Sequence, residues 1–278
     1  MGRGLRVQYY GAIYHIVHEG IDGENIFSDD EDKSYLLKLM SESKEVKDFK
    51  IFAYTILDNS YNLLIKTLNI PISNIMHSIN FKYAKYYNIK ARRTGRVFHE
   101  RYKATLVQDE RYLLPIIKYI HRFPVEAQLC NSMEEYKWSS HAFYRMNVES
   151  MVNIGEVLDM FSSNRIEAIV KYVEFMERED ENYENIKCMS KNSAIIGTEE
   201  FVRDIKGKGN RRSLDELLRQ SCPGEDEFNL IKNGFRERSL TQYKIEYIIK
   251  AKDEGYTFKE IGENIGVTAA AVRGLVKR

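Results

Sequence analysis

A basic stretch with interleaved aromatic residues is the first part of the sequence that could do chemistry. Between Phe81 and Lys103, eight lysines and arginines stand against the single acid Glu100, a net charge of +7 in 23 residues. Cations attract phosphates because binding releases condensed counterions, and aromatic rings offer stacking surfaces to unpaired bases. The stretch therefore favours a nucleic-acid partner over a solvated helix face with its tyrosines in the core. The candidate contacts are Lys82, Lys85, Lys90, Arg92, Arg93, Arg96, Arg101 and Lys103.

The C-terminal segment has a helix-turn-helix pattern. Ile261 and Ile265 stand four residues apart on one expected helix, and Gly266 supplies a tight turn. Small residues at the start of the next helix allow close approach to base edges, while basic residues further on can reach phosphates. The pattern favours duplex DNA as the partner over a purely structural helical bundle. The candidate contacts are Thr268, which also caps the second helix, Ala269, Ala270, Arg273 and Lys277.

An α+β order of elements must position the basic stretch. Alternating apolar residues predict a strand over 12–18, and two short apolar segments, 51–57 and 61–67, predict a hairpin with its turn at Asp58-Asn59-Ser60. Helical spacing predicts one helix over 30–47 and a second that Pro71 opens. A further strand over 102–108 is followed by a helix over 110–122, which Pro124 is expected to stop. The hairpin makes at least part of the sheet antiparallel.

The second half of the sequence changes character. Residues 154–160 and 166–176 have helical periods, and residues 174–184 contain six acids against one arginine. We therefore expect a domain over residues 1–145, then a helical connector and acidic linker over 146–212. From residue 213 on, every segment has a helical period, so residues 213–278 are predicted to form a separate all-α module.

Composition narrows the class of protein. With 278 residues, 43% of them hydrophobic, the chain can form roughly two domains. No apolar run approaches 18 residues, so we expect no membrane span and a cytoplasmic protein. Three widely spaced cysteines predict neither a disulfide framework nor a Cys-x-x-Cys metal site. The balance of 42 basic against 41 acidic residues hides the basic stretch, because acids concentrate in 29–32 and 174–184.

Eight separated blocks resemble the single-tyrosine transposases of the HUH superfamily, specifically the REP-associated tyrosine transposases. The resemblance covers about residues 3 to 145 and implies a ferredoxin-like α+β domain with an HUH-type antiparallel sheet. It also implies cutting and rejoining of single-stranded DNA at the foot of hairpins, through a covalent 5′-phosphotyrosine intermediate. The blocks are Leu5-Arg-Val, Gly11-Ala-Ile-Tyr-His-Ile, Ile26-Phe-Ser-Asp-Asp-Glu-Asp-Lys, Leu57-Asp-Asn-Ser-Tyr-Asn-Leu-Leu-Ile, Gly95-Arg-Val-Phe-His-Glu-Arg-Tyr-Lys, Tyr112-Leu-Leu, Lys118-Tyr-Ile-His and Trp138-Ser-Ser-His.

The resemblance implies a tyrosine nucleophile and a metal held by a His-x-His pair. Tyr119 stands where the nucleophile of the family stands. The Asn-His-x-His block of the family reads Asn59-Ser60-Tyr61-Asn62, so Ser60 and Asn62 replace both histidines, and Phe123 replaces a later asparagine. Without the metal, a tyrosine hydroxyl with its ordinary pKa of about 10 has little help toward attack on a phosphodiester.

The metal positions are therefore expected to be degenerate and to hold no metal. His15, His18 and His121 are substitute ligands to consider, but none has a second ligand at a diagnostic spacing. An oxygen site for Mg²⁺ that includes Asp58 is the alternative. If the protein is active, its cofactor is Mg²⁺ or Mn²⁺.

The sequence thus predicts a transposase-like DNA-binding protein with lost or weakened nicking, from a domesticated or decaying mobile element. The N-terminal domain is expected to bind single-stranded or hairpin DNA, and the C-terminal module duplex DNA. Two alternatives stay open: an active DNA strand transferase with an altered metal site, and a transcriptional regulator that uses the C-terminal helix-turn-helix. The resemblance also leaves a homodimer open.

Overall fold

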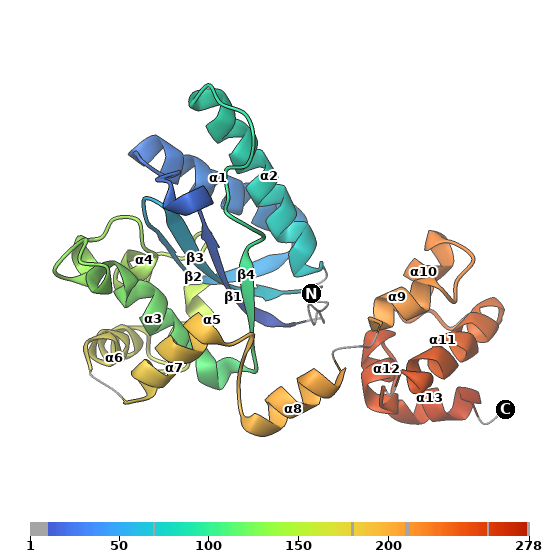
Figure 1. Ribbon diagram of the computed structural model, residues 1–278. Helices are drawn as coiled ribbons and strands as arrows, with labels where there is room; N and C mark the ends of the chain where they lie inside the picture. The colour runs from blue at the N-terminus through green and yellow to red at the C-terminus, as the bar shows by residue number, and fades with distance from the viewer. Residues whose placement is uncertain (1–10, 69, 179–180, 209–211, 255, 277–278) are drawn as a thin grey trace. The chain divides into compact units, whose positions relative to one another are not determined.

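The chain folds into two compact units, of which the first ends at Asp204 and the second begins at Ile205. The computed structural model (Figure 1) describes residues 11–68, 70–178, 181–208, 212–254 and 256–276. Within these ranges, no helix combines the length and the apolar character that crossing a membrane requires.

A five-stranded sheet forms the centre of the first unit, in the order β2-β3-β1-β4-β5. Strands β1 to β4 are labelled in Figure 1. The first four strands are antiparallel to their neighbours, and β5 pairs with β4 in parallel. The order strand, helix, strand, strand, helix, strand is ferredoxin-like, which confirms the expected α+β class. The short β5, far along the chain, has no counterpart among the predicted strands. The strands are β1 (Ile13–Glu19), β2 (Phe49–Ile56), β3 (Ser60–Thr67), β4 (Lys103–Val107) and β5 (Ile195–Ile196).

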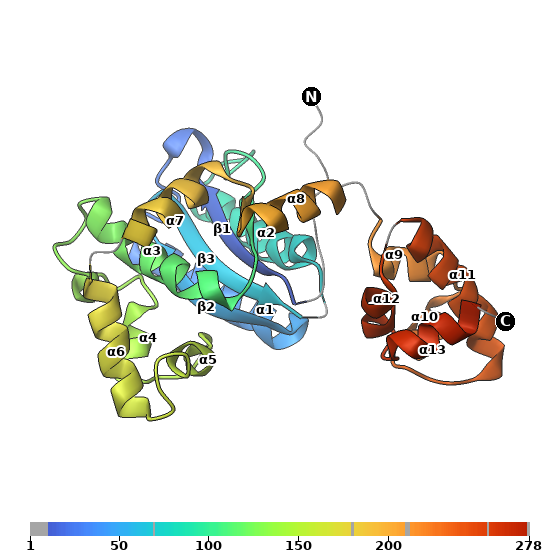
Figure 2. The same ribbon diagram turned by 90° about the horizontal axis from the view of Figure 1, so that it is seen from below.

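Helices cover both faces of this sheet (Figures 1 and 2). On one face lie α1 (Asp30–Lys47) and α2 (Ile72–Lys90), and on the other lie α3 (Leu113–Glu126) and α7 (Glu181–Asn192). Buried aromatic residues hold α2 in place on its face of the sheet. One of them is Tyr83, whose hydroxyl donates to the Ile26 carbonyl at 2.5 Å. Because side chains alternate along a strand, odd-numbered residues of β1 share the α3 face with even-numbered residues of β3.

The helix that carries Tyr119 does not stop at Pro124, so that prediction was wrong. After the turn Glu110–Tyr112, α3 runs from Leu113 to Glu126 with Pro124 inside it. Proline has no N–H, so the Ile120 carbonyl four residues earlier loses its helical donor. The hydroxyl of Thr55 on β2 donates to this carbonyl at 2.7 Å. A tertiary hydrogen bond thus replaces the helical one and lets the helix continue.

The chain after residue 145 packs into the first unit up to Asp204, past the domain end that the sequence suggests. On α6, Ala168, Tyr172 and Met176 are fully buried, so this segment contributes to a core. The expected acidic linker over 174–184 includes the end of α6 and the start of α7. The helices of this part are α4 (His141–Met146), α5 (Ile154–Leu158), α6 (Arg165–Glu177) and α8 (Glu199–Lys208), and the short 3-10 turns are Ile21–Gly23, Glu110–Tyr112 and Met133–Glu135.

The second unit is helical throughout its described residues and has a hydrophobic core of its own. Two glycines shape the junction before α13. Gly266 adopts a φ of +66°, which favours glycine, and a Cβ on Gly262 would lie 2.5 Å from the Val267 carbonyl oxygen. The elements are α9 (Leu214–Arg219), α10 (Glu225–Lys232), the turn Arg238–Leu240, α11 (Thr241–Asp253), α12 (Phe258–Asn264) and α13 (Ala269–Val276). Fully buried core residues are Leu217, Leu218, Ile231, Tyr247, Ile248, Ala251, Ile261 and Val272.

Candidate functional site

Three side chains meet on the α3 face of the sheet: His15 from β1, Asn62 from β3 and Tyr119 from α3. The His15 Nε2 lies 3.1 Å from the Asn62 Oδ1. Since an amide oxygen can only accept, the imidazole carries its hydrogen on Nε2 and donates it. The rings of His15 and Tyr119 meet edge to face with 5.7 Å between their centroids. The structure thus brings the expected tyrosine and one of the two expected metal positions to the same place.

Tyr119 is deeply buried, with 3% of its surface exposed. Burial raises the pKa of its hydroxyl to about 12, and the charge of Glu126 acts in the same direction. At pH 7, a pKa of about 12 leaves about 1 in 10⁵ of the hydroxyl groups deprotonated. The ring of Phe123 packs against Tyr119 with its centroid at 5.7 Å. The surroundings of this hydroxyl therefore favour its neutral form.

The polar atoms near the expected metal positions do not fit a divalent cation. The Asn62 oxygen accepts from His15. The Asn62 nitrogen, a donor with no lone pair available to a metal, is buried and has no hydrogen-bond partner among the described residues. Ser60, the other position, donates its hydroxyl to the Asn59 side chain at 3.1 Å. Beside Asn62, the His15 Nδ1 offers a buried nitrogen lone pair, and one nitrogen does not make a metal site.

The histidines considered as substitute ligands lie apart. His18 points to the opposite face of the sheet, where its ring stacks on Phe98 at 3.9 Å. Burial lowers the pKa of His15 to about 4, and the charge of Lys103 adds to this. In the described part of the chain, no three His, Cys, Asp or Glu side chains come together as a metal-binding group.

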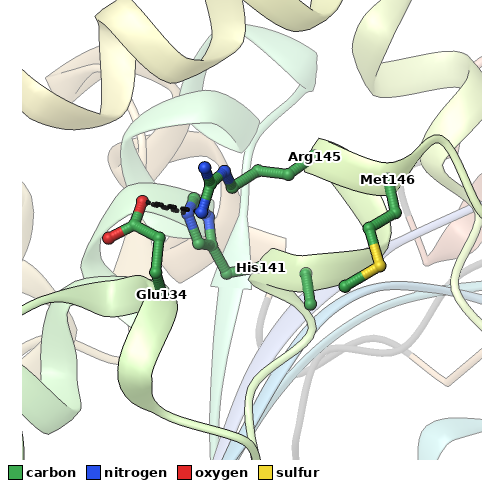
Figure 3. Close-up of a pocket in the computed structure, with 5 residues that line it drawn as sticks. Glu134, His141, Arg145 and Met146 are labelled. Atoms are coloured by element: carbon green, nitrogen blue, oxygen red, sulfur yellow. Dashed lines mark hydrogen bonds and ion pairs between the residues drawn. The ribbon is translucent and has the colours of Figure 1, made fainter.

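His121 belongs to a different, fully satisfied network that ties α3 to α4 and α6. Its Nε2 lies 2.6 Å from the Ser140 hydroxyl and its Nδ1 lies 3.0 Å from the Tyr172 hydroxyl. The same hydroxyl lies 2.8 Å from the Nδ1 of His141, whose Nε2 faces Glu134 at 3.3 Å (Figure 3). Both ring nitrogens of His121 are occupied, so it cannot serve as a ligand.

The network borders a small surface hollow of about 310 Å³ that His141, Glu134 and Arg145 line (Figure 3). Arg145 lies 3.3 Å from the Glu134 carboxylate and pairs with it. The carboxylate of Glu134 in this hollow is therefore neutralised by Arg145 and is not a free catalytic group.

The segment from α6 to β5 covers the α3 face through contacts far apart in sequence. Lys118 on α3 donates to the carbonyls of Phe175 and Arg178 at the end of α6. Lys103 on β4 donates to the Ser190 carbonyl, at 2.8 Å, and to the Lys191 carbonyl at the end of α7. Each lysine places its positive charge at the negative end of a helix. Sequence reasoning missed this cover, since no local pattern links residues some 60 to 90 positions apart.

The contacts of α7 with α3 complete this cover. Tyr183 donates its hydroxyl to Glu126, and Lys187 pairs with the same carboxylate at 3.0 Å. Glu126 lies near enough to Tyr119 to raise the pKa of its hydroxyl. The acid that fastens α7 to α3 thus also disfavours the phenolate of Tyr119.

The lysines and arginines of the basic stretch form two groups, those with an acidic or carbonyl partner and those without one among the described residues. Lys90 lies 2.7 Å from both Asp29 and Asp32, and Arg93 donates to Glu24 at 2.6 Å. Lys103 is held by the carbonyls of α7. The remaining five side chains are exposed and form no ion pair with a described residue: Lys82, Lys85, Arg92, Arg96 and Arg101.

The aromatic residues of the same stretch belong mainly to the core. Tyr83 is fully buried. Less than a tenth of the surface is exposed for Tyr87, Phe98 and Tyr102. Their ring stacking with one another and with His18 replaces the base stacking that the sequence suggests. The exceptions are Phe81, with 62% of its surface exposed, and the half-buried Tyr86.

The candidate contacts of the C-terminal unit lie around the start of α13. The Thr268 hydroxyl accepts from the Ala271 N–H at 3.2 Å and caps the helix. Ala270 is exposed, Ala269 is half-buried, and the exposed Arg273 lies over the Phe258 ring at 5.5 Å. Lys277 lies outside the described residues.

Comparisons with known proteins agree with the sequence blocks. Residues 8–123 match the family model "Transposase IS200 like". Among solved structures, one described as a REP-associated tyrosine transposase bound to a REP hairpin is similar with a TM-score of 0.46 and 12% identity, over 54% of this chain and 90% of the other. A second, named as a candidate transposase from Deinococcus radiodurans R1, is similar with a TM-score of 0.31 and 16% identity, over 44% of this chain and 95% of the other. None of the curated proteins matches.

The matched stretch contains β3 with Ser60 and Asn62 and most of α3, including Tyr119. Residues 8–123 of this transposase-like chain therefore resemble the IS200-like transposase family.

Proposed function

We propose that the protein binds single-stranded or hairpin DNA through its first unit and has lost most or all DNA-nicking activity. The hydrogen bond between His15 and Asn62 carries this proposal. The bond occupies one lone pair of the only side-chain oxygen at position 62, and the His15 ring that donates it lies edge to face against the ring of Tyr119.

Burial of Tyr119 supports the loss of nicking independently. A nucleophilic hydroxyl must reach the phosphorus atom of the substrate, and the Tyr119 residue that carries this one is only 3% exposed, with Phe123 packed against its ring. Its raised pKa of about 12 further lowers the population of phenolate. The burial of Tyr119 and its raised pKa therefore both disfavour attack on a phosphodiester.

The free cations of the basic stretch support DNA binding. Lys82, Lys85, Arg92, Arg96 and Arg101 are exposed and have no acidic partner among the described residues. Such a group attracts phosphates whatever the base sequence, and counterion release supplies the free energy.

Incubation of the full chain with hairpin-tipped DNA and Mg²⁺ or Mn²⁺ tests the proposal. We expect binding in a gel-shift measurement and no covalent protein–DNA adduct on a denaturing gel. An adduct that disappears in Tyr119→Phe would establish the competing function, an active DNA strand transferase with an altered metal site. In that case Asn62→Ala should lower the amount of adduct, and a chelator should abolish it.

A second candidate function is transcriptional regulation through the C-terminal unit. It is favoured by the exposed Ala270 and Arg273 beside the capped start of α13, on a unit that has its own core. The fragment Ser213–Arg278 should then bind duplex DNA with a sequence preference, and Arg273→Ala should weaken this binding. A fragment that binds no duplex DNA would contradict this function and leave DNA binding to the first unit.

A further inference from the structure

A hollow on the helical face away from Tyr119 combines an exposed aromatic ring with two lysines. It has a volume of about 530 Å³, and its lining comes from the end of α1 and from α2 and the residues before it. No acidic residue lines it. Its members are Lys47, Ile70, Asn74, His77, Ser78, Phe81 and Lys82.

The aromatic part of the hollow is already arranged for stacking. The rings of His77 and Phe81, one helical turn apart on α2, lie nearly parallel with 5.9 Å between their centroids. Phe81 is 62% exposed, whereas the neighbouring Tyr83 and Tyr87 are buried. An exposed phenyl ring is costly in water, and a flat π-system of an unpaired base would cover it.

The basic part of the hollow lacks a counter-charge. Lys47 donates to the Asn74 carbonyl at 2.5 Å, and no ion pair with a described acid joins Lys47 or Lys82. Burial lowers the pKa of Lys47, and the nearby positive charge of Lys82 lowers it further. An anion between the two ammonium groups would relieve this repulsion.

We propose that this hollow holds one unpaired nucleotide of single-stranded DNA, with the base against Phe81 and the phosphate beside Lys47 and Lys82. It rests on the proposed function only in taking DNA as the partner. Because α2 and α3 cover opposite faces of the sheet, the binding site is separate from Tyr119 (Figures 1 and 2). It makes the protein prefer DNA with unpaired bases over blunt duplex.

Fluorescence anisotropy with the full chain tests this site on two labelled DNAs, an unstructured thymidine oligonucleotide and a blunt hairpin. Phe81→Ala should weaken binding of the oligonucleotide about tenfold, the loss of one stacked base, and should leave the hairpin unaffected. Phe81→Trp should restore the affinity. Val46→Ala is the matched control, since Val46 is an apolar side chain of α1 with 79% of its surface exposed.

The two lysines give a second readout. The logarithm of the oligonucleotide affinity should fall with the logarithm of the salt concentration, and counterion release from single strands sets the slope at about 0.7 for each neutralised phosphate. Lys47→Gln with Lys82→Gln should make this slope shallower by about that amount for each phosphate that is no longer neutralised. Lys38→Gln, on α1 but outside the hollow, should change it less.

Two results would overturn the site. One is wild-type protein that does not bind the oligonucleotide, and the other is Phe81→Ala binding it as wild type does. Wild-type protein that binds the hairpin but not the oligonucleotide would overturn the site and leave the proposed function standing, whereas binding of neither DNA would contradict both.

Discussion

The Nε2 of His15 and the Oδ1 of Asn62, on neighbouring strands and 47 residues apart in sequence, form a buried hydrogen bond of 3.1 Å. The bond stands where the family resemblance implies a metal ligand. A hydrogen bond between two neutral groups lies at this position, and it places no charge in the interior of the sheet.

This arrangement predicts that the wild-type protein gives no saturable heat signal when Mn²⁺ is titrated into it. Ser60→His combined with Asn62→His should create saturable binding, because residues two apart on β3 direct both imidazoles to one face. Asn62→His alone is the control and should bind weakly at most. Saturable binding by the wild-type chain that Asn62→Ala removes would contradict the prediction.

Acid should destabilise the first unit through His15. The pKa of His15 is about 4 in the folded state and 6.5 ordinarily. Between these pH values, His15 is therefore protonated in the unfolded chain and neutral in the folded chain. The free energy of unfolding should therefore fall as pH drops from 6.5 to about 4, by up to roughly 3 kcal/mol. Burial also lowers the pKa values of His121 and His141, which act in the same direction.

Urea unfolding at several pH values measures this dependence. Replacement of both partners, His15→Leu with Asn62→Leu, removes this titrating group without leaving a lone polar partner. The pH dependence of the unfolding free energy should then become less steep, with the part that His121 and His141 contribute remaining. An unchanged slope in the double variant would show that His15 is not the source.

Thr55 and Pro124 should be energetically coupled. Thr55→Val leaves the Ile120 carbonyl without a donor and should cost about 1–3 kcal/mol. In a Pro124→Ala background the helix regains its own N–H donor, so the same substitution should cost clearly less. Chemical unfolding of the four proteins of this double-mutant cycle gives the coupling; additive effects would refute it.

Two glycines of the C-terminal unit should respond in opposite ways to alanine. A Cβ on Gly262 would meet the Val267 carbonyl oxygen at 2.5 Å, whereas one on Gly274 meets nothing within 4 Å. Gly262→Ala should destabilise the unit by roughly 1–3 kcal/mol, and Gly274→Ala in α13 should stabilise it by up to about 1 kcal/mol. Thermal unfolding of the fragment Ser213–Arg278, followed by circular dichroism, measures both.

DNA binding should weaken steeply with added salt despite the near-neutral total charge. Arg96→Ala and Arg101→Ala should each lower the salt dependence, because both side chains are exposed without an acidic partner among the described residues. Lys90→Ala and Arg93→Ala, which remove cations already paired with acids, are the matched controls and should change it less. A flat salt response would mean that the stretch does not touch phosphates.

The sequence predicts local elements well wherever a short-range pattern determines them. The hairpin around Asp58-Asn59-Ser60 and the helix that follows Pro71 lie within a few residues of their expected places. Helix α3 continues past Pro124 because Thr55, 69 positions earlier in the chain, supplies a hydrogen bond that no local pattern encodes.

Predictions about the site also succeed or fail according to whether the contacts are local in sequence. Tyr119 and Asn62 come together through strand and helix packing, which the family resemblance implies. Whether Lys90 or Lys103 is free depends on partners 61 and 87 positions away, and charge counting along the chain cannot reveal them. Most aromatic rings of the basic stretch pack in the core instead of facing bases, because the tertiary fold determines their burial.

The parallel pairing of β5 with β4 has a consequence for how the chain is made. Hydrogen bonds from Leu106 to Ala194 and from Gln108 to Ile196 close an edge of the sheet that stays open until the ribosome has passed residue 196. A nascent or truncated chain that ends near residue 145 exposes this edge, and open edges pair with other chains. Synthesis of the late segment thus protects the early sheet from aggregation.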